Sequence, residues 1–210
     1  MQVKKEDVKE KILDSARSEF LEHGYAAASL RVIAQKAGLT KGAVYSYFKN
    51  KDALFCELTS SATSFIEGEF QHDKCDYLFQ RGSNSYELTV ECFRRCAYKV
   101  LDNYESFKLL LFCSAGSSLQ SYKENIIQVY AQNFYKLLMF ITNTESCAEV
   151  MINEMFIHTL ATTYVSFLEE IVLHEPKRKE VDDYVEQIAI FIHYGLKKLY
   201  LHKINSKYSN

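Results

Sequence analysis

Apolar residues recur every three or four positions along most of the chain, the spacing that places side chains on one face of an α-helix. Near the N-terminus this spacing predicts a helix over residues 5–23. Six further helices with a similar pattern are predicted over residues 51–70, 84–104, 105–115, 119–142, 147–174 and 180–203. The chain has one Pro and seven Gly in 210 residues, and this scarcity of breakers favours long helices over a many-turned β fold.

Residues 29–51 predict two short helices joined by a tight turn, and they read SLRVIAQKAGLTKGAVYSYFKNK. Ile33 and Ala34 lie on the apolar face of the first short helix. Gly38 follows where a helix end needs a residue that tolerates positive φ, and Thr40 is a suitable N-cap for the second helix. This arrangement is typical of a helix-turn-helix, whose second helix enters the DNA major groove. We therefore expect an all-α protein of about nine helices, beginning with a three-helix domain.

Charge is divided unevenly along the chain. Residues 1–52 hold ten Lys and Arg against seven Asp and Glu, whereas the whole chain has a formal net charge of −2. No acidic residue lies between His23 and Lys51. A basic N-terminal segment on an otherwise acidic chain favours an oriented approach to phosphate. A solvated helical hairpin can also carry the same charges by chance.

A longer spaced pattern extends beyond the helix-turn-helix and consists of Gly24, Tyr25, Ser29, Ile33, Ala34, Ala37, Gly38, Leu39, Gly42, Tyr45, Tyr47, Phe48, Lys51 and Leu54. This pattern, which covers about the first quarter of the chain, resembles the N-terminal domain of the tetracycline-repressor (TetR) family of transcriptional regulators. The resemblance implies a DNA-binding domain over residues 1–50 and a helical effector-binding and dimerisation domain over residues 51–210. It further implies a homodimeric repressor that a small hydrophobic ligand releases from a palindromic operator in double-stranded DNA.

The resemblance nominates a set of DNA-binding residues in and around the second short helix. Gly42 lets the backbone approach DNA, Tyr45 can donate its hydroxyl to phosphate, and Lys41 can reach a base edge. Tyr47 also fits the inner face of the helix, so its burial beside Phe48 is an open alternative. The nominated residues are Arg31, Thr40, Lys41, Gly42, Ala43, Tyr45, Tyr47 and Lys51.

The body is rich in Phe, Tyr, Met and Cys, which suit either a packed core or the lining of a hydrophobic effector pocket. The sequence does not separate these two interpretations. The candidate effector-binding residues are Cys96, Phe107, Phe112, Cys113, Phe134, Met139, Met155 and His158.

The last two predicted helices carry apolar residues at alternating steps of three and four, a narrow seam suited to near-parallel helix packing. In the family, two such helices from each subunit form a four-helix dimer interface, while burial within one subunit is the alternative. The candidate interface residues are Val165, Leu168, Val185, Ile188, Ile192, Gly195 and Leu199.

No enzyme signature, catalytic residue, metal site or cofactor is predicted, because the sequence has no phosphate-binding glycine loop, His-Glu zinc motif or glycine-flanked nucleophilic serine. The six cysteines are expected to be free thiols in a cytoplasmic protein without a membrane span. Two alternatives stay open: a thiol- or metal-responsive DNA-binding sensor that uses Cys92 and Cys96, and a helical ligand carrier that no longer binds DNA.

Overall fold

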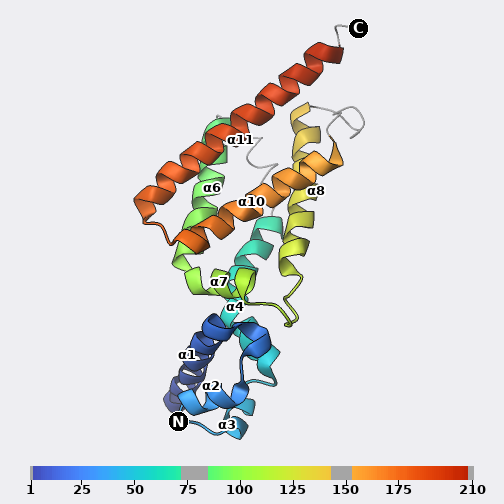
Figure 1. The fold of residues 1–210 in the computed structure, drawn as a ribbon. Helices are drawn as coiled ribbons and strands as arrows, with labels where there is room; N and C mark the ends of the chain where they lie inside the picture. Colours follow the sequence, from blue (N-terminus) through green and yellow to red (C-terminus); the bar gives the residue numbers. More distant parts are fainter. Residues whose placement is uncertain (1, 72–84, 143–152, 208–210) are drawn as a thin grey trace. The chain divides into compact units, whose positions relative to one another are not determined.

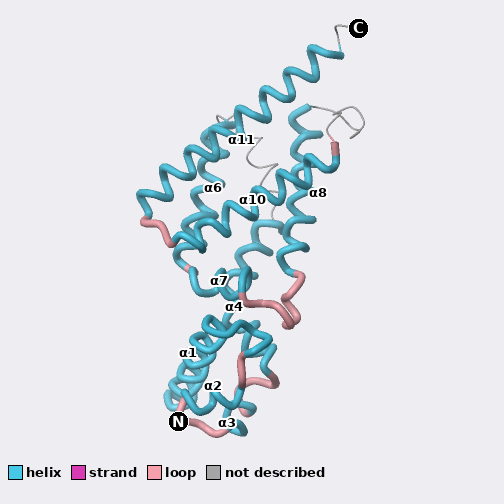
Figure 2. The backbone as a smooth tube through the Cα atoms, in the orientation of Figure 1, coloured by secondary structure: helices cyan, strands magenta, loops and turns pink. Residues whose placement is uncertain are grey.

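The computed structural model describes residues 2–71, 85–142 and 153–207, and every regular element in these ranges is an α-helix (Figures 1 and 2). The all-α prediction is therefore confirmed. The predicted start of the helix over 147–174 lies outside the described residues, and the structure describes this helix from Glu154. They are α1 (Gln2–Ala27), α2 (Leu30–Lys36), α3 (Lys41–Tyr45), α4 (Lys51–Gln71), α6 (Ser85–Asp102), α7 (Tyr104–Phe112), α8 (Tyr122–Thr142), α10 (Glu154–His174) and α11 (Arg178–Lys207).

Contacts divide the chain into two compact units. The head unit consists of Met1–Glu67 and Asn103–Asn125, and the body unit consists of Gly68–Asp102 and Ile126–Asn210. The head unit therefore includes α7 and the start of α8, which follow α6 in the sequence but pack with the N-terminal helices. The sequence pattern did not predict this grouping, and the expected domain boundary after residue 50 stays a prediction.

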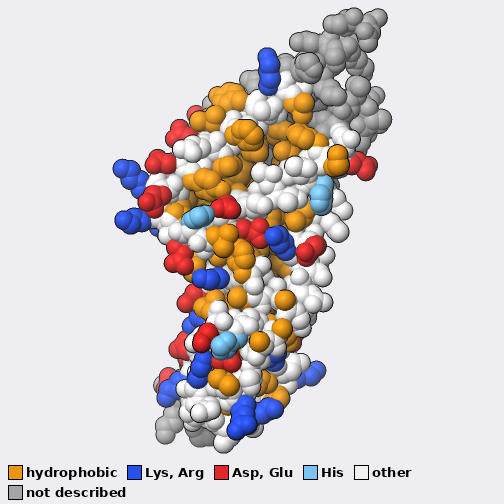
Figure 3. All heavy atoms as spheres, in the orientation of Figure 1, with side chains coloured by type: hydrophobic (Ala, Val, Ile, Leu, Met, Phe, Trp, Pro, Cys, Tyr) orange, Lys and Arg blue, Asp and Glu red, His pale blue; other side chains and the backbone are white. Residues whose placement is uncertain are grey.

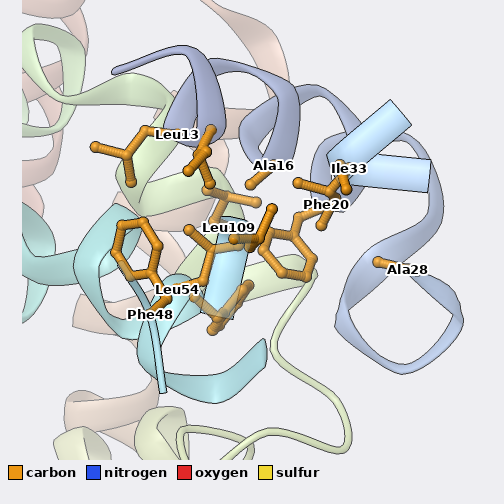
Figure 4. Close-up of a cluster of buried hydrophobic side chains, with 12 residues drawn as sticks. Leu13, Ala16, Phe20, Ala28, Ile33, Phe48, Leu54 and Leu109 are labelled. Atoms are coloured by element: carbon orange, nitrogen blue, oxygen red, sulfur yellow. The ribbon is translucent and has the colours of Figure 1, made fainter. Parts of the chain in front are cut away.

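The head unit is organised around aromatic rings that pack against one another. The ring centroids of Phe20 on α1 and Phe55 on α4 lie 5.1 Å apart in an edge-to-face arrangement, and Tyr25 lies 5.2 Å from Phe55. Each fully buried side chain of this size contributes roughly 1.5–3 kcal/mol to folding. The buried cluster drawn in Figure 4 consists of Ile12, Leu13, Ala16, Phe20, Ala28, Ile33, Ala34, Val44, Phe48, Leu54, Phe55 and Leu109.

The body unit has an aromatic core of its own. In this unit α6 packs against α11 and α10. Phe93 of α6 and Phe167 of α10 meet edge to face with centroids 5.0 Å apart, and Tyr184 of α11 stacks on Phe167 at 5.2 Å. Asp182 of α11 accepts hydrogen bonds from Tyr98 and from Arg94, both on α6. Exposed ion pairs add little stability. The role of these polar contacts is therefore to fix how α6 and α11 align.

By length and composition α10 would suit a membrane span, the only helix in the described ranges that does. Eight of its residues are buried. Because a core helix of a globular unit meets the same criterion, the finding does not identify a span. The expectation that the protein does not enter a membrane stays a prediction.

A buried carboxylate ties α1 to α2 in the head unit. Glu19 is 2% exposed, accepts the backbone N–H of Ser29 at 3.3 Å and pairs with Lys36 Nζ at 2.9 Å. Burial alone would raise the pKa of the Glu19 carboxyl, but the hydrogen bonds from Lys36 and Ser29 outweigh it and hold this pKa below its ordinary value. Glu19 thus holds α2 at both of its ends.

Glu19→Gln should lower the free energy of unfolding by about 1–3 kcal/mol at neutral pH, because a buried charge-assisted contact is lost. The pKa of Glu19 is lowered on folding, so its stabilisation is complete above the unfolded-state pKa and disappears as the pH falls through the folded-state pKa. Chemical denaturation at fixed protein concentration should therefore show the two proteins converging below about pH 4.

Glu22→Gln is the matched control, because the exposed Glu22 carboxylate lies 3.6 Å from the same Lys36 Nζ and should contribute less than about 1 kcal/mol. A Glu19→Gln protein as stable as the wild type at pH 7, or a difference that grows on acidification, would contradict the assignment.

Candidate nucleic-acid interface

The two short helices form the predicted helix-turn-helix. Ser29 caps α2 by accepting the N–H of Arg31 at 3.3 Å, and Thr40 caps α3 by accepting the N–H of Ala43 at 3.1 Å. Gly38, between the two helices, has φ 69°, which favours glycine over residues with a side chain. Both the turn glycine and the Thr40 cap were predicted from the sequence and are confirmed.

The solvent face of α3 and its N-cap carry four of the eight nominated DNA-binding residues. Thr40, Lys41 and Gly42 are exposed, and Tyr45 is 46% exposed although its ring is large and apolar. Lys41 Nζ lies 5.7 Å from the Tyr45 ring centroid, within cation–π distance. The opposite side of α3 holds Val44, which is buried in the head core. One short helix therefore presents a cation, a glycine backbone and a phenol on a single surface.

Three nominated residues lie beside this face rather than on it. Arg31 is exposed on α2 and Ala43 is half-buried. Tyr47 is half-buried and packs against the head core, which agrees with the alternative interpretation of its position. Its role in DNA binding stays a prediction.

Lys51, nominated as a phosphate contact, makes several contacts within the head unit. Its Nζ donates to the carbonyl oxygen of Tyr25 at 2.7 Å and to that of Ala28 at 3.1 Å, and it lies 4.3 Å from the Tyr25 ring centroid. Lys51 therefore caps the carbonyls that follow the break in α1 at Gly24, where φ is 70° and ψ is 168°. The sequence pattern did not reveal this structural role.

The basic side chains divide into two groups. Lys36 and Lys51 are held by partners inside the head unit, whereas Arg31, Lys41 and Lys49 are exposed. Figure 3 shows Lys and Arg side chains gathered over α3. Because no acidic residue lies between His23 and Lys51, these exposed cations face no carboxylate from their own segment.

The candidate effector residues are divided between the two units, and their role stays a prediction. Phe107 and Cys113 pack in the head unit, and Phe112, in the same unit, is 43% exposed. Met155 and His158 are exposed on α10 of the body unit, and the side chain of Met139 lies outside the described residues.

A small cavity in the body unit measures about 10 Å³, the space of one water molecule. Among the candidate effector residues with described side chains, only Phe134 lines it. Cys96 lies one contact away, because the Tyr164 hydroxyl donates to its sulfur at 2.9 Å, and burial raises the pKa of Tyr164 well above its ordinary value. The lining consists of Phe93, Phe134, Leu160, Thr163, Tyr164, Ile188 and Ile192.

The candidate dimer-interface residues differ in how far they are buried. Val165, Leu168 and Val185 are at most 3% exposed in the single chain, so they have no surface to offer a partner, and the alternative of burial within one subunit holds for them. Ile188 and Ile192 line the cavity, Leu199 is half-buried, and only Gly195 of the seven is exposed. A Cβ built on Gly195 would meet no atom within 4 Å.

The exposed apolar residues of α10 and α11 were not among the residues nominated for the dimer interface. Phe191 of α11 and Met155 of α10 are each 74% exposed, and Tyr194 is 53% exposed. Figure 3 shows hydrophobic side chains spread over α10 and α11 of the body unit. The seam spacing identified the buried stripe of α11, while Phe191 and Gly195 lie on a neighbouring face of the same helix.

The thiol- or metal-responsive sensor stays an open alternative. Cys56, Cys92, Cys96 and Cys113 form no disulfide bond within the described ranges. Among the same residues, no three His, Cys, Asp or Glu side chains are grouped to hold a metal ion. Cys75 and Cys147 lie outside the described residues.

Residues 12–58 match the family described as bacterial regulatory proteins, tetR family. The HTH-type transcriptional repressor Rv1474c of Mycobacterium tuberculosis is 44% identical over 52 residues, which are 25% of this chain and 28% of that protein. The regulator AcrR of Shigella flexneri is 39% identical over 69 residues, 31% of this chain and 32% of that protein. The chain therefore aligns with about a third or less of these relatives' lengths. They are regulators and not enzymes, in agreement with the prediction.

Solved structures share the fold over most of the chain. A TerR/AcrR-family transcriptional regulator from Aquifex aeolicus VF5 superposes with a TM-score of 0.58 and 21% identity, over 88% of this chain and 99% of that one. The TetR-family regulator PfmR from Thermus thermophilus gives a TM-score of 0.59 at 18% identity, over 86% and 96% of the two chains. Residues 12–58 of this chain thus match the tetR family of bacterial regulatory proteins, and the chain as a whole shares the all-α fold of these solved structures.

Proposed function

We propose that this protein is a cytoplasmic transcriptional repressor that binds a palindromic operator as a homodimer. The observation that carries the proposal is the solvent face of α3, where exposed Lys41, Gly42 and Tyr45 stand on a helix-turn-helix that lies within the residues of the family match. A relative that matches this segment is itself named a repressor.

The chemistry of this face suits the DNA major groove. Gly42 has no side chain, so backbone can approach DNA closely, and the Tyr45 hydroxyl can donate to a phosphate oxygen. Lys41 starts the helix and can reach the O6 and N7 acceptors of guanine. Few long side chains project from α3, so DNA shape supplies part of the sequence preference.

The homodimer is supported by the exposed apolar face of α10 and α11. Phe191 is 74% exposed, and the open space beside Gly195 allows a second helix to approach closely. A two-fold axis through this face would pair it with itself, as an isologous interface requires. Such a dimer would present two copies of α3 to two half-sites about 34 Å apart.

Effector binding is proposed for the body-unit cavity. Its walls are almost wholly aromatic and aliphatic, with the Tyr164 hydroxyl and Thr163 as the polar groups. A lining of this kind favours a neutral hydrophobic molecule. Because the cavity holds about one water, any larger ligand must separate Phe93, Phe134 and their neighbours, and binding would therefore change the spacing of the helices that carry them.

Lys41→Ala should change the preferred base at one position of each half-site, because a groove-facing amine is lost. Tyr45→Phe should weaken binding about equally for all sequences, since only a phosphate contact is removed. Selection from a random DNA pool followed by titration of the selected duplexes measures both effects.

Lys177→Ala is the matched control, because it removes an exposed lysine from the body unit and should leave preference and affinity unchanged. If Lys41→Ala and Tyr45→Phe select and bind the same DNA as the wild type, α3 is not the recognition helix. A wild type that selects no sequence at all would favour the ligand-carrier alternative.

Phe191→Glu should convert the dimer to monomer, because it places a charge at the centre of an apolar interface. Sedimentation velocity across a range of concentrations measures this change. Gln128→Glu, which adds the same charge at an exposed position of α8, should leave the dimer intact. A monomeric wild type, or a Phe191→Glu dimer of undiminished affinity, would exclude this face as the interface.

A further inference from the structure

Three segments that are distant in the sequence meet around Tyr25 in the head unit. The backbone N–H of Tyr25 donates to the carbonyl of Cys113 at 2.8 Å. Its own carbonyl accepts Lys51 Nζ at 2.7 Å. The end of α1 after the break at Gly24, the start of α4 and the segment after α7 are therefore joined at one residue.

Asp52 makes a second bridge between the start of α4 and the segment after α7. Its Oδ1 accepts the backbone N–H of Ser118 at 2.9 Å, and its Oδ2 accepts the thiol of Cys56 at 3.8 Å. Burial would raise the pKa of the Asp52 carboxyl, but the hydrogen bonds from Ser118 and Cys56 hold it below its ordinary value. Asp52 is consequently ionised near neutral pH, and a charged acceptor strengthens each of these bonds.

The segment from Cys113 to Ser118 is shaped to lie against the head. Gly116 has φ +86°, a conformation that residues with side chains rarely adopt, and its backbone lies against Ala26 and Tyr25. Ser117 is 5% exposed, and its hydroxyl donates to the carbonyl of Ser114 at 2.6 Å. These contacts fix the backbone that presents the Ser118 N–H to Asp52.

Chain connectivity links this segment to the helices that line the cavity. It lies between α7 and α8, and α8 carries Phe134. On the other side α7 follows directly after α6, which carries Phe93. Leu109 of α7 is part of the head core. Along the sequence, a part of the head core therefore lies between the two helices that carry Phe93 and Phe134.

We propose that Asp52 is a positioning residue that couples this segment to DNA binding: the Asp52–Ser118 hydrogen bond holds the head unit in its DNA-binding conformation. The inference rests on the proposed function. It assigns the coupling to one carboxylate and one backbone N–H, and it requires that DNA binding and the Asp52–Ser118 bond strengthen each other by the same factor.

The test compares three variants with DNA that the wild-type chain selects from a random pool. Asp52→Ala removes the acceptor and should weaken binding about tenfold, the effect of losing a hydrogen bond to a charged group. Asp52→Asn keeps an oxygen for the Ser118 N–H and should restore most of the affinity. Asn50→Ala is the matched control, because it removes the α4 cap, the Asn50 Oδ1 bond to the Ala53 N–H at 2.7 Å, without touching Ser118.

Amide exchange of Ser118 in the wild type gives a second, independent measurement. Bound DNA should slow it by about the factor that Asp52→Ala costs in affinity. An Asp52→Ala effect no larger than that of Asn50→Ala, no recovery in Asp52→Asn, or an exchange rate of Ser118 unaffected by DNA would each overturn the coupling. If the wild type selects no DNA, the proposed function fails instead and the coupling fails with it.

Discussion

The packing of Phe20, Tyr25 and Phe55 is the interaction on which the rest of the head unit depends. A five-residue helix such as α3 cannot hold its shape alone, because helix nucleation is unfavourable and so few hydrogen bonds do not offset it. Its orientation is set by Val44, which joins the same core. The aromatic cluster thereby converts the hydrophobic spacing of α1 and α4 into a fixed position for an exposed surface on α3.

The same packing decides which charges are available to DNA. Lys36 neutralises the buried Glu19, and Lys51 caps the carbonyls after Gly24. Both lysines are therefore used to assemble the head, whereas Lys41 stays at the surface. A count of basic residues in the N-terminal segment overstates its capacity for phosphate, because some of that charge is engaged inside the fold.

Local features of this fold were predictable from the sequence, and long-range ones were not. The Thr40 cap and the positive φ of Gly38 depend on residues a few positions apart, and both were predicted correctly from their neighbours. Packing of Leu109 into the head core joins residues almost a hundred positions apart, and helical periodicity contains no information on such pairing. Seam spacing likewise marked Val185 as buried but did not distinguish its own chain from a partner's.

The central claim is that the solvent face of α3 lies against DNA, and a photo-crosslinking amino acid tests it most directly. Benzoylphenylalanine placed at Tyr45 or at Phe112 replaces an aromatic residue of similar exposure, 46% and 43%, in the same unit. With DNA selected by the wild type, irradiation should attach the strand to the protein substituted at position 45 and leave the protein substituted at position 112 free. Crosslinking at position 112 without crosslinking at position 45 would contradict the account.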